Sequence, residues 1–129
     1  AAGLTDKIVF TGHRPDMREI YAVSCIVLAL SNKAESFGRT ALEPLCIGTP
    51  VAGFDLGGVG EILAAMFPGG RVPNQDALAL RDIVGKLLTG PTPAVEPNTQ
   101  FLLSDMCTQT LQLYDELIAE RANSEAVSP

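Results

Sequence analysis

The fold of this chain is decided by the run Cys25-Ile26-Val27-Leu28-Ala29-Leu30, in which every residue is apolar. Strands in the middle of a parallel sheet have this continuous pattern, because they are buried on both faces. We therefore predict a central parallel strand here. A second run, Lys7-Ile8-Val9-Phe10-Thr11-Gly12, ends at a glycine and predicts another buried strand that leads into a loop.

Segments with helical and strand-like patterns alternate through the rest of the chain. Helices are predicted over residues 17–23, from Ser36 to Gly48, over 59–67 and over 77–88, and strands over 51–54 and 70–72. This alternation predicts an α/β fold, with a Rossmann-like parallel sheet and helices on both of its faces. The proline-rich residues 89–98 predict a linker, followed by a long C-terminal helix over about residues 98–121 and a frayed tail over residues 122–129.

The segment that carries the strongest functional signal is Glu35-Ser36-Phe37-Gly38-Arg39-Thr40-Ala41-Leu42-Glu43. We predict Ser36 as the N-cap of the helix, which leaves the backbone N–H groups of Gly38, Arg39 and Thr40 available to an anion. Gly38 would let a phosphate approach closely, because it has no Cβ. The alternative is an ordinary capped helix with a tolerated glycine, which is the commoner case for such a segment taken alone.

Two carboxylates, Glu35 and Glu43, stand at the ends of this segment. At about 100° per residue, Glu43 returns near the Glu35 side of the helix, so the pair could bind sugar hydroxyls on both sides of a diphosphate. The alternative is two solvated surface carboxylates. Pro44 disfavours helical geometry at Glu43 and predicts a kinked or late-starting helix at this point.

Two other glycine-containing loops could contribute to a site. The loop Gly57-Gly58-Val59-Gly60-Glu61 lacks the spacing of dinucleotide sites and the lysine of a P-loop, so it is either a second anion cradle or a flexible turn. Gly12-His13-Arg14 follows a predicted strand at the same sheet edge, where His13 could reach a ligand, although a structural or exposed histidine is commoner. No cluster of residues has metal-ligand spacing, so no metal site is predicted.

The composition of the chain excludes several kinds of partner. Its 129 residues are 47% hydrophobic, which predicts one domain with a well-buried core. The net charge of −6 argues against a surface for nucleic acid or anionic membrane, and no apolar run is long enough to span a membrane. Cys25, Cys46 and Cys107 are odd in number and lie in apolar runs, so we predict buried free thiols in a reducing cytoplasm.

Taken together, the motifs resemble the C-terminal, donor-binding half of the GT-B retaining glycosyltransferases of family 4, the group 1 glycosyltransferases. The resemblance covers about residues 4–90, and it implies that residues 1–121 form a truncated, partial nucleotide-sugar-binding domain. The stretch around Phe67-Pro68-Gly69-Gly70 is similar to enzymes that build cell-surface polysaccharide or lipopolysaccharide. Five elements at matching spacing carry the resemblance: the strand ending at Gly12, the strand ending at Ser31, the E-x7-E motif from Glu35 to Glu43, the Gly48-Thr49-Pro50-Val51 turn and the Gly57–Glu61 loop.

The resemblance implies a role for each residue of the motifs. Glu35 would contact the transferred sugar and stabilise the charge that develops at its reacting carbon, and Glu43 would bind the ribose hydroxyls. The donor would be a UDP-, GDP- or ADP-sugar whose diphosphate is bound without a metal ion, and no further cofactor is implied. The other donor-binding residues that it implies are Gly12 and His13 near the base or sugar, Phe37, Gly38, Arg39 and Thr40 around the diphosphate, and Gly58 and Glu61 in a nearby loop.

The resemblance also implies the context in which the chain works. Sugar would be transferred with retention to a carbohydrate or lipid-linked acceptor, in the cytoplasm or at the inner face of the membrane. The family's N-terminal acceptor domain and first donor-domain strands have no counterpart here, so we expect a part of a larger enzyme, inactive alone, that self-associates through exposed strand edges. Two alternatives stay open: a nucleotide-sugar epimerase of the same fold, and a non-catalytic doubly wound domain that binds a nucleotide or a protein partner.

Overall fold

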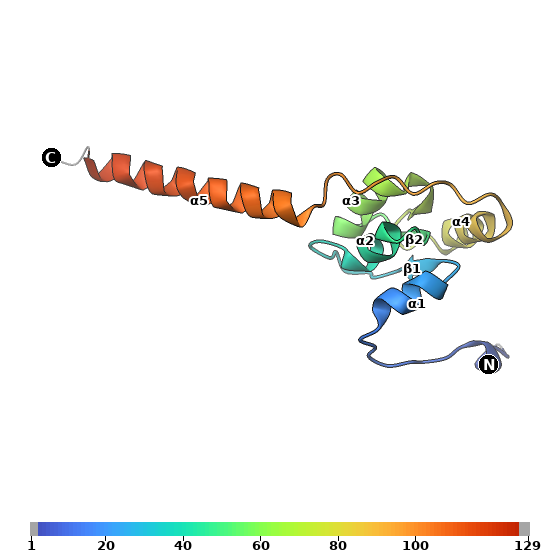
Figure 1. Cartoon of the computed structure of the whole chain (residues 1–129). Coiled ribbons are helices and arrows are strands. Elements are labelled where there is room, and N and C mark those ends of the chain that lie inside the picture. The colour runs from blue at the N-terminus through green and yellow to red at the C-terminus, as the bar shows by residue number, and fades with distance from the viewer. Residues whose placement is uncertain (1–2, 127–129) are drawn as a thin grey trace. The chain divides into compact units, whose positions relative to one another are not determined.

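Three parallel strands in the order β1-β2-β3 form the sheet of this protein (Figure 1). The computed structural model describes the backbone of residues 3–126 and the side chains of residues 3–121, in two units that comprise residues 1–95 and 96–129. In the first unit, β1 (Val27–Ala29) pairs with β2 (Val51–Phe54), which pairs in turn with β3 (Arg71–Val72). The α/β class with a parallel, Rossmann-like sheet is therefore confirmed.

The centre of the sheet is β2, whose four residues are all buried. Successive side chains of a strand point to opposite faces, so the sheet is covered on both sides at this strand. Gly53 is tightly packed, since a Cβ at this position would lie 2.9 Å from Cγ1 of Val59 and 3.1 Å from the carbonyl oxygen of Ala29. A larger residue at position 53 would force the side chain of Val59, on the helix that covers this strand, to shift.

The helices of the first unit alternate with its strands along the chain. They are α1 (Met17–Val23), α2 (Arg39–Cys46), α3 (Gly57–Met66) and α4 (Ala77–Thr89), with short 3-10 helices η1 (Thr5–Lys7) and η2 (Pro68–Gly70). Helices α2 and α3 pack against each other and against β2, and α1 packs against α2. Ile62 and Leu63 of α3 are completely buried, and burial of each such side chain contributes about 1.5–3 kcal/mol to folding.

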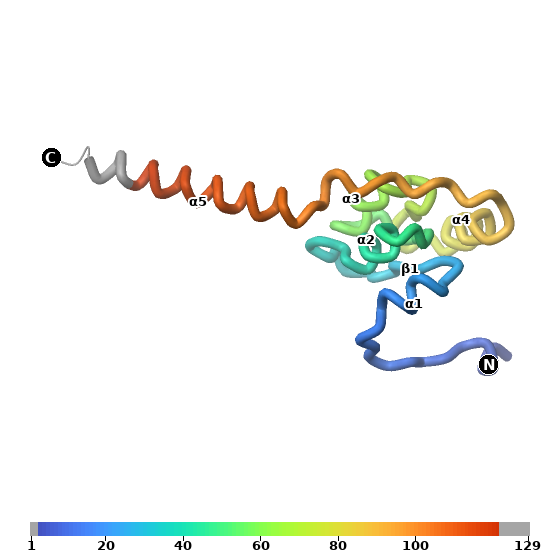
Figure 2. The backbone as a smooth tube through the Cα atoms, in the orientation of Figure 1, coloured from blue at the N-terminus to red at the C-terminus, as the bar shows by residue number. Residues whose placement is uncertain are grey.

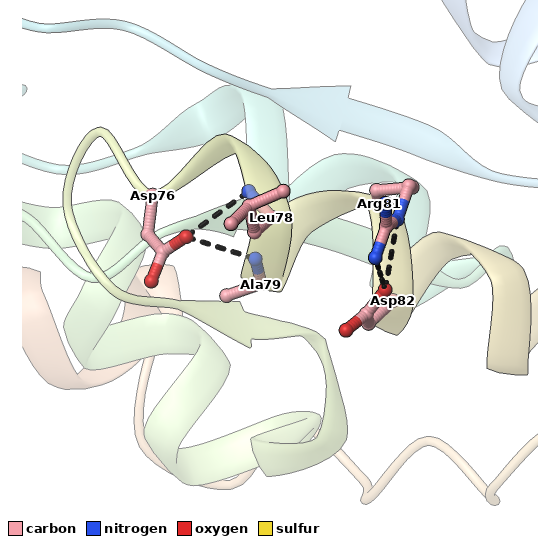
Figure 3. Close-up of polar contacts among 5 residues, drawn as sticks. All are labelled: Asp76, Leu78, Ala79, Arg81 and Asp82. Carbon is pink, nitrogen blue, oxygen red and sulfur yellow. Dashed lines mark hydrogen bonds and ion pairs between the residues drawn. The ribbon is translucent and has the colours of Figure 1, made fainter.

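The start of α4 shows how local sequence sets a helix boundary. The carboxylate of Asp76 accepts hydrogen bonds from the backbone N–H groups of Leu78, at 3.0 Å, and Ala79, at 2.9 Å (Figure 3). These N–H groups have no partner within the helix, so the cap satisfies two of them at once. Arg81 and Asp82, in the next turn, form an exposed ion pair.

The position of β1 differs from the prediction. It is an edge strand of three residues, not a central strand of six, and Leu28 is 48% exposed. The predicted strand over Lys7–Gly12 is also wrong, because residues 8–12 form no strand and Phe10 is 96% exposed. A strand needs a hydrogen-bonded neighbour, and among the described residues nothing pairs with the outer side of β1.

The start of α2 is a second correction. Gly38, and not Ser36, is the N-cap, with a positive φ of 85°. The helix then continues through Glu43 and the buried Pro44, so it does not start late at the proline. A proline in this position removes one intrahelical hydrogen bond, and α2 ends two residues later. Gly48, with a φ of +84°, follows the helix as predicted.

Two further expectations concern the cysteines and the C-terminal helix. Cys25, Cys46 and Cys107 are all exposed, so the prediction that they are buried is wrong. Cys25 lies in a bend outside the strand, and the other two lie on helix surfaces. The last helix, α5 (Leu103–Ala126), starts later than predicted and runs into the region expected to be a frayed tail, of which residues 127–129 lie outside the described part.

Candidate functional site

Two loops meet at the carboxyl edge of the sheet. The loop of Glu35 follows β1, and Gly57 follows β2. Because β1 and β2 are parallel neighbours, the loops that follow them leave the sheet at the same edge, where α/β folds bind ligands. A backbone hydrogen bond joins the two loops, since the N–H of Gly58 donates to the carbonyl oxygen of Glu35 over 2.9 Å.

Three glycines allow the backbones of these loops to touch. A Cβ on Gly58 would lie 2.3 Å from both the carbonyl carbon and the carbonyl oxygen of Phe37. A Cβ on Gly38 would lie 2.7 Å from the carbonyl carbon of Gly58, and one on Gly57 would lie 2.7 Å from the carbonyl oxygen of Glu35. Every one of these contacts is with backbone, which cannot rotate away. The glycines therefore lock the Glu35 loop onto the first turn of α3.

The carboxylate of Glu35 lies beside the first turn of α2. Glu35 is half-buried, and its Oε2 accepts a hydrogen bond of 3.3 Å from Oγ1 of Thr40, the second residue of the helix. Its backbone is fixed through Gly58, so the main chain and side chain of Glu35 have separate anchors. This arrangement holds one carboxylate at the mouth of α2, as the sequence predicts.

The N-terminus of α2 retains the chemistry of an anion site even though the cap has moved. The carbonyl oxygen of Gly38 accepts from the N–H groups of Ala41, at 2.9 Å, and Leu42, at 3.1 Å. The N–H groups of Arg39 and Thr40 precede these first intrahelical bonds, and the first turn contains no acidic residue. A negatively charged group placed here would meet the positive end of the helix dipole.

Glu43 has a different surrounding from Glu35. Its Oε1 accepts a hydrogen bond of 2.8 Å from Nε of Arg39, one turn earlier on α2. It also borders a pocket of about 290 Å³ between α1 and α2, whose lining residues are Arg18, Tyr21, Leu42, Glu43, Cys46 and Ile47. Burial raises the pKa of Tyr21, and the charge of Glu43 raises this pKa further, while Arg39 opposes the increase.

Of the remaining residues predicted for the site, some lie near the Glu35 loop and others have no hydrogen bond or ion pair to it among the described residues. Glu61 is exposed and follows Gly57 by four residues on α3, so both lie on the helix face that meets the Glu35 loop. Phe37 is 46% exposed at the junction of the two loops. Gly12 and His13 are exposed, and in the part of the chain that the structure describes, no hydrogen bond or ion pair joins them to the Glu35 loop.

One polar pair at the same edge of the sheet was missed from the sequence. Asp55 directly follows β2, and its N–H donates to the carbonyl oxygen of Val72 over 2.8 Å. Its Oδ2 is 2.6 Å from the guanidinium of Arg71 on β3. A Cβ on Gly60 would lie 2.5 Å from Oδ1 of Asp55, so this carboxylate also constrains α3. The signal that could have found it is an acid placed immediately after a buried strand.

The site therefore combines the N-terminus of α2, which has a favourable charge for an anion, with the carboxylates of Glu35 and Glu43, which can accept hydrogen bonds from hydroxyl groups. Among the side chains of residues 3–121, no group of three or more histidines, cysteines or acids is arranged to hold a metal ion. None of the described helices is both long and apolar enough to cross a membrane.

Comparison with known proteins gives a uniform picture. The sequence model of the family "Glycosyl transferases group 1" matches residues 1–101. The chain is 38% identical over 90 residues to the 2-deoxystreptamine N-acetyl-D-glucosaminyltransferase of Streptomyces fradiae, a match that covers 69% of this chain and 21% of that protein. It is 34% identical over 95 residues to the lipopolysaccharide core biosynthesis mannosyltransferase LpcC of Rhizobium leguminosarum bv. viciae, with 74% and 27% covered.

A third relative matches more of the chain. The D-inositol 3-phosphate glycosyltransferase of Mycobacteroides abscessus is 30% identical over 125 residues, which cover 92% of this chain and 28% of that protein. The chain thus spans about a quarter of the length of the curated relatives it matches. The region that the family model matches, residues 1–101, includes both loops at the carboxyl edge of the sheet.

Proposed function

Because this chain belongs to the glycosyl transferases group 1, we propose that it is the donor-binding part of an enzyme that transfers a sugar from a nucleotide-diphosphate-sugar. The acceptor would be a carbohydrate or a lipid-linked sugar, as in the synthesis of cell-surface polysaccharide. The observation that carries the proposal is the locked pair of loops at the carboxyl edge of the sheet. It puts the Glu35 carboxylate beside the N-terminus of α2, where a diphosphate would bind.

In this proposal the two acids have separate tasks. Glu35 stabilises the positive charge that develops on the sugar as its bond to the diphosphate breaks, and Thr40 holds this carboxylate at the helix mouth. Glu43 binds the ribose hydroxyls at the rim of the α1/α2 pocket, after Arg39 releases it. The N–H groups of Arg39 and Thr40 hold the leaving diphosphate without a metal ion.

The other residues implied by the family have supporting positions. Gly38 and Gly58 bring the two loops into contact, with Phe37 at the junction and Glu61 on the adjacent face of α3. Gly12 and His13 belong to a segment that, among the described residues, no hydrogen bond or ion pair joins to the Glu35 loop, and their contact with the base or sugar is part of the proposal. Transfer with retention and the need for an acceptor domain are parts of the same proposal.

Calorimetry with UDP-, GDP- and ADP-sugars tests donor binding by the 129-residue chain. We expect one base to be preferred, and Glu43→Gln to weaken its binding by about 10- to 100-fold, because a hydrogen bond to a charged group contributes about 1.5–3 kcal/mol. Glu120→Gln, on α5, is the matched control and should leave binding unchanged. Absence of binding to every donor would favour the non-catalytic alternative.

The role of Glu35 is tested by turnover in a protein that joins this donor-binding part to an acceptor domain. We expect Glu35→Gln to lower kcat by about 10²–10³-fold and to leave nucleotide affinity nearly unchanged, because it acts on charge present only in the transition state. The reverse pattern for Glu35 and Glu43 would refute the assignment of roles. Release of nucleotide without any acceptor would favour an epimerase. Sugar transfer by the 129-residue chain without an acceptor domain would contradict the proposal that this chain supplies donor binding only.

A further inference from the structure

The first turn of α3 is bonded to the Glu35 loop but is weakly stabilised by its own sequence. Figure 2 shows α2 and α3 side by side, and the two helices contact each other. Three of the first four residues of α3 are the glycines Gly57, Gly58 and Gly60, and glycine weakens a helix because it loses the most backbone entropy on folding. The N-cap, Leu56, makes no side-chain hydrogen bond to the helix start. The turn therefore depends on contacts from outside the helix.

The carboxylate of Asp55 packs against this turn. Asp55 directly follows β2 and is two residues from Gly53, so both positions point to the same face of the sheet. This face carries α3, since a Cβ on Gly53 would meet the side chain of Val59. A Cβ on Gly60 would lie 2.5 Å from Oδ1 of Asp55, so this oxygen fills the space where a side chain of residue 60 would begin.

Asp55 is itself held by β3. Its N–H donates to the carbonyl oxygen of Val72 over 2.8 Å, and its Oδ2 accepts from Nη2 of Arg71 over 2.6 Å. Arg71 is in register with Gly53 in the parallel pair, so its side chain leaves the sheet on the same face as that of Asp55. The guanidinium balances the charge of the carboxylate, so the pair adds no net charge at this edge of the sheet.

We propose that Asp55 is a positioning residue for Glu35. Its Oδ1 packs against Gly60, which lies in the same turn of α3 as Gly58. The N–H of Gly58 donates to the carbonyl oxygen of Glu35 over 2.9 Å, so the turn sets the position of the loop that carries the carboxylate. Asp55 touches no substrate in this role and acts on sugar transfer only through Glu35. This inference rests on the proposed function, in which Glu35 stabilises the developing charge.

Hydrogen exchange of the Gly58 amide in the 129-residue chain tests the contact without any sugar transfer. Relative to the amide of the buried Leu63, we expect Asp55→Ala to raise its exchange rate by at least about tenfold, because the turn opens locally when its neighbour is lost. Asp82→Ala removes the same group from the exposed pair with Arg81 on α4 and is the matched control, which should leave the rate unchanged. An unchanged rate in Asp55→Ala would overturn the proposal.

A compensating substitution separates this contact from general damage to the fold. Gly60→Ala alone would place its Cβ 2.5 Å from Oδ1 of Asp55. In the Asp55→Ala background, the same methyl group occupies the space that Oδ1 leaves, with backbone atoms of residue 55 at 3.1 and 3.3 Å. We expect the double variant to recover most of the protection of the Gly58 amide that each single variant loses, because residues in contact have coupled effects. Effects that simply add would contradict the contact.

Turnover links the contact to Glu35. In a protein that joins this donor-binding part to an acceptor domain, Asp55→Ala should lower kcat by about 10- to 100-fold, since misplacing a catalytic group by about 1 Å can cost about 10²-fold. Donor affinity should be nearly unchanged, because the proposed diphosphate and ribose contacts belong to α2. Asp55→Asn keeps the shape of the side chain and should retain most of the kcat.

The pattern of the kinetic constants decides the role of Asp55. A loss of donor affinity with kcat unchanged in Asp55→Ala would overturn the positioning role, and so would an equal loss of kcat in Asp55→Ala and Asp55→Asn. Absence of turnover in the unsubstituted protein would overturn the proposed function instead, and the exchange of the Gly58 amide would still decide whether Asp55 positions the Glu35 loop.

Discussion

The substitution Gly58→Ala gives the sharpest test of the contact between the two loops. The added methyl group would lie 2.3 Å from the carbonyl carbon and oxygen of Phe37. Both are backbone atoms of the loop that carries Glu35, so relief requires that the loop or the start of α3 move. We expect the hydrogen bond from the N–H of Gly58 to Glu35 to lengthen or break as a result.

The size of the effect follows from two opposing contributions. Overpacking costs about 1–3 kcal/mol and more when the neighbour is rigid, whereas replacing a helical glycine by alanine gains up to about 1 kcal/mol. Because the contacted atoms are backbone, we expect a net loss of about 2 kcal/mol in the free energy of unfolding of the first unit. For a unit of this size, that corresponds to a fall in Tm of about 8–16 °C.

Gly85→Ala is the matched control for this substitution. Gly85 lies inside α4, and a Cβ there would meet no atom within 4 Å. This variant should gain about 0.5–1 kcal/mol, because alanine loses less backbone entropy on folding. Urea unfolding followed by tyrosine fluorescence in a Tyr114→Phe background reports the first unit through Tyr21. Equal stabilisation by Gly58→Ala and Gly85→Ala would refute the reasoning about the loops.

Two other predictions concern α1 and α4. Burial, and then the charge of Glu43, raises the pKa of Tyr21 in the folded protein above the value of about 10 that tyrosine has in the unfolded chain. The free energy of unfolding should therefore fall as the pH rises from about 10 through the higher pKa of the folded protein. Ultraviolet titration should show that Glu43→Gln lowers this pKa; an unchanged pKa would contradict the contact. Asp76→Ala removes the cap of α4 and should lower the free energy of unfolding, measured with urea, by about 1 kcal/mol. Asp82→Ala removes one partner of an exposed ion pair and should lower it by less than about 0.5 kcal/mol. Equal losses for the two variants would contradict the role of Asp76 as the cap.

The elements with strong local signals could be predicted from the sequence. Helix α1, strand β2 and helix α4 agree with the prediction within about two residues, because apolar periodicity and turn residues act over short distances. The family was also predicted correctly, since its motifs occur in order along the chain. The order of the strands depends on contacts between distant segments, which is why β1 was wrongly placed at the centre of the sheet.

The local geometry of the site also depends on contacts between distant segments, which local sequence signals do not reveal. The prediction of Ser36 as the cap used the sequence preference of helix starts alone. The helix actually starts after Gly38, which has a positive φ and lies so close to the backbone of Gly58 that a Cβ would not fit. The pairing of Asp55 with Arg71 was likewise hidden, because it joins neighbouring strands across sixteen positions of sequence. The contacts proposed between Glu35 and the transferred sugar, and between Glu43 and the ribose hydroxyls, stay predictions.

The contact among Gly38, Gly57 and Gly58 has a consequence for how this site could change under selection. A side chain at any one of these positions can be accommodated only when the opposite backbone retreats, so the two segments cannot diversify one residue at a time. Mutant libraries that vary these glycines would lose most of their folded members at these positions. Variation at Phe37, Arg39 and Glu61, whose side chains are exposed, leaves the shared backbone intact and offers the more productive route.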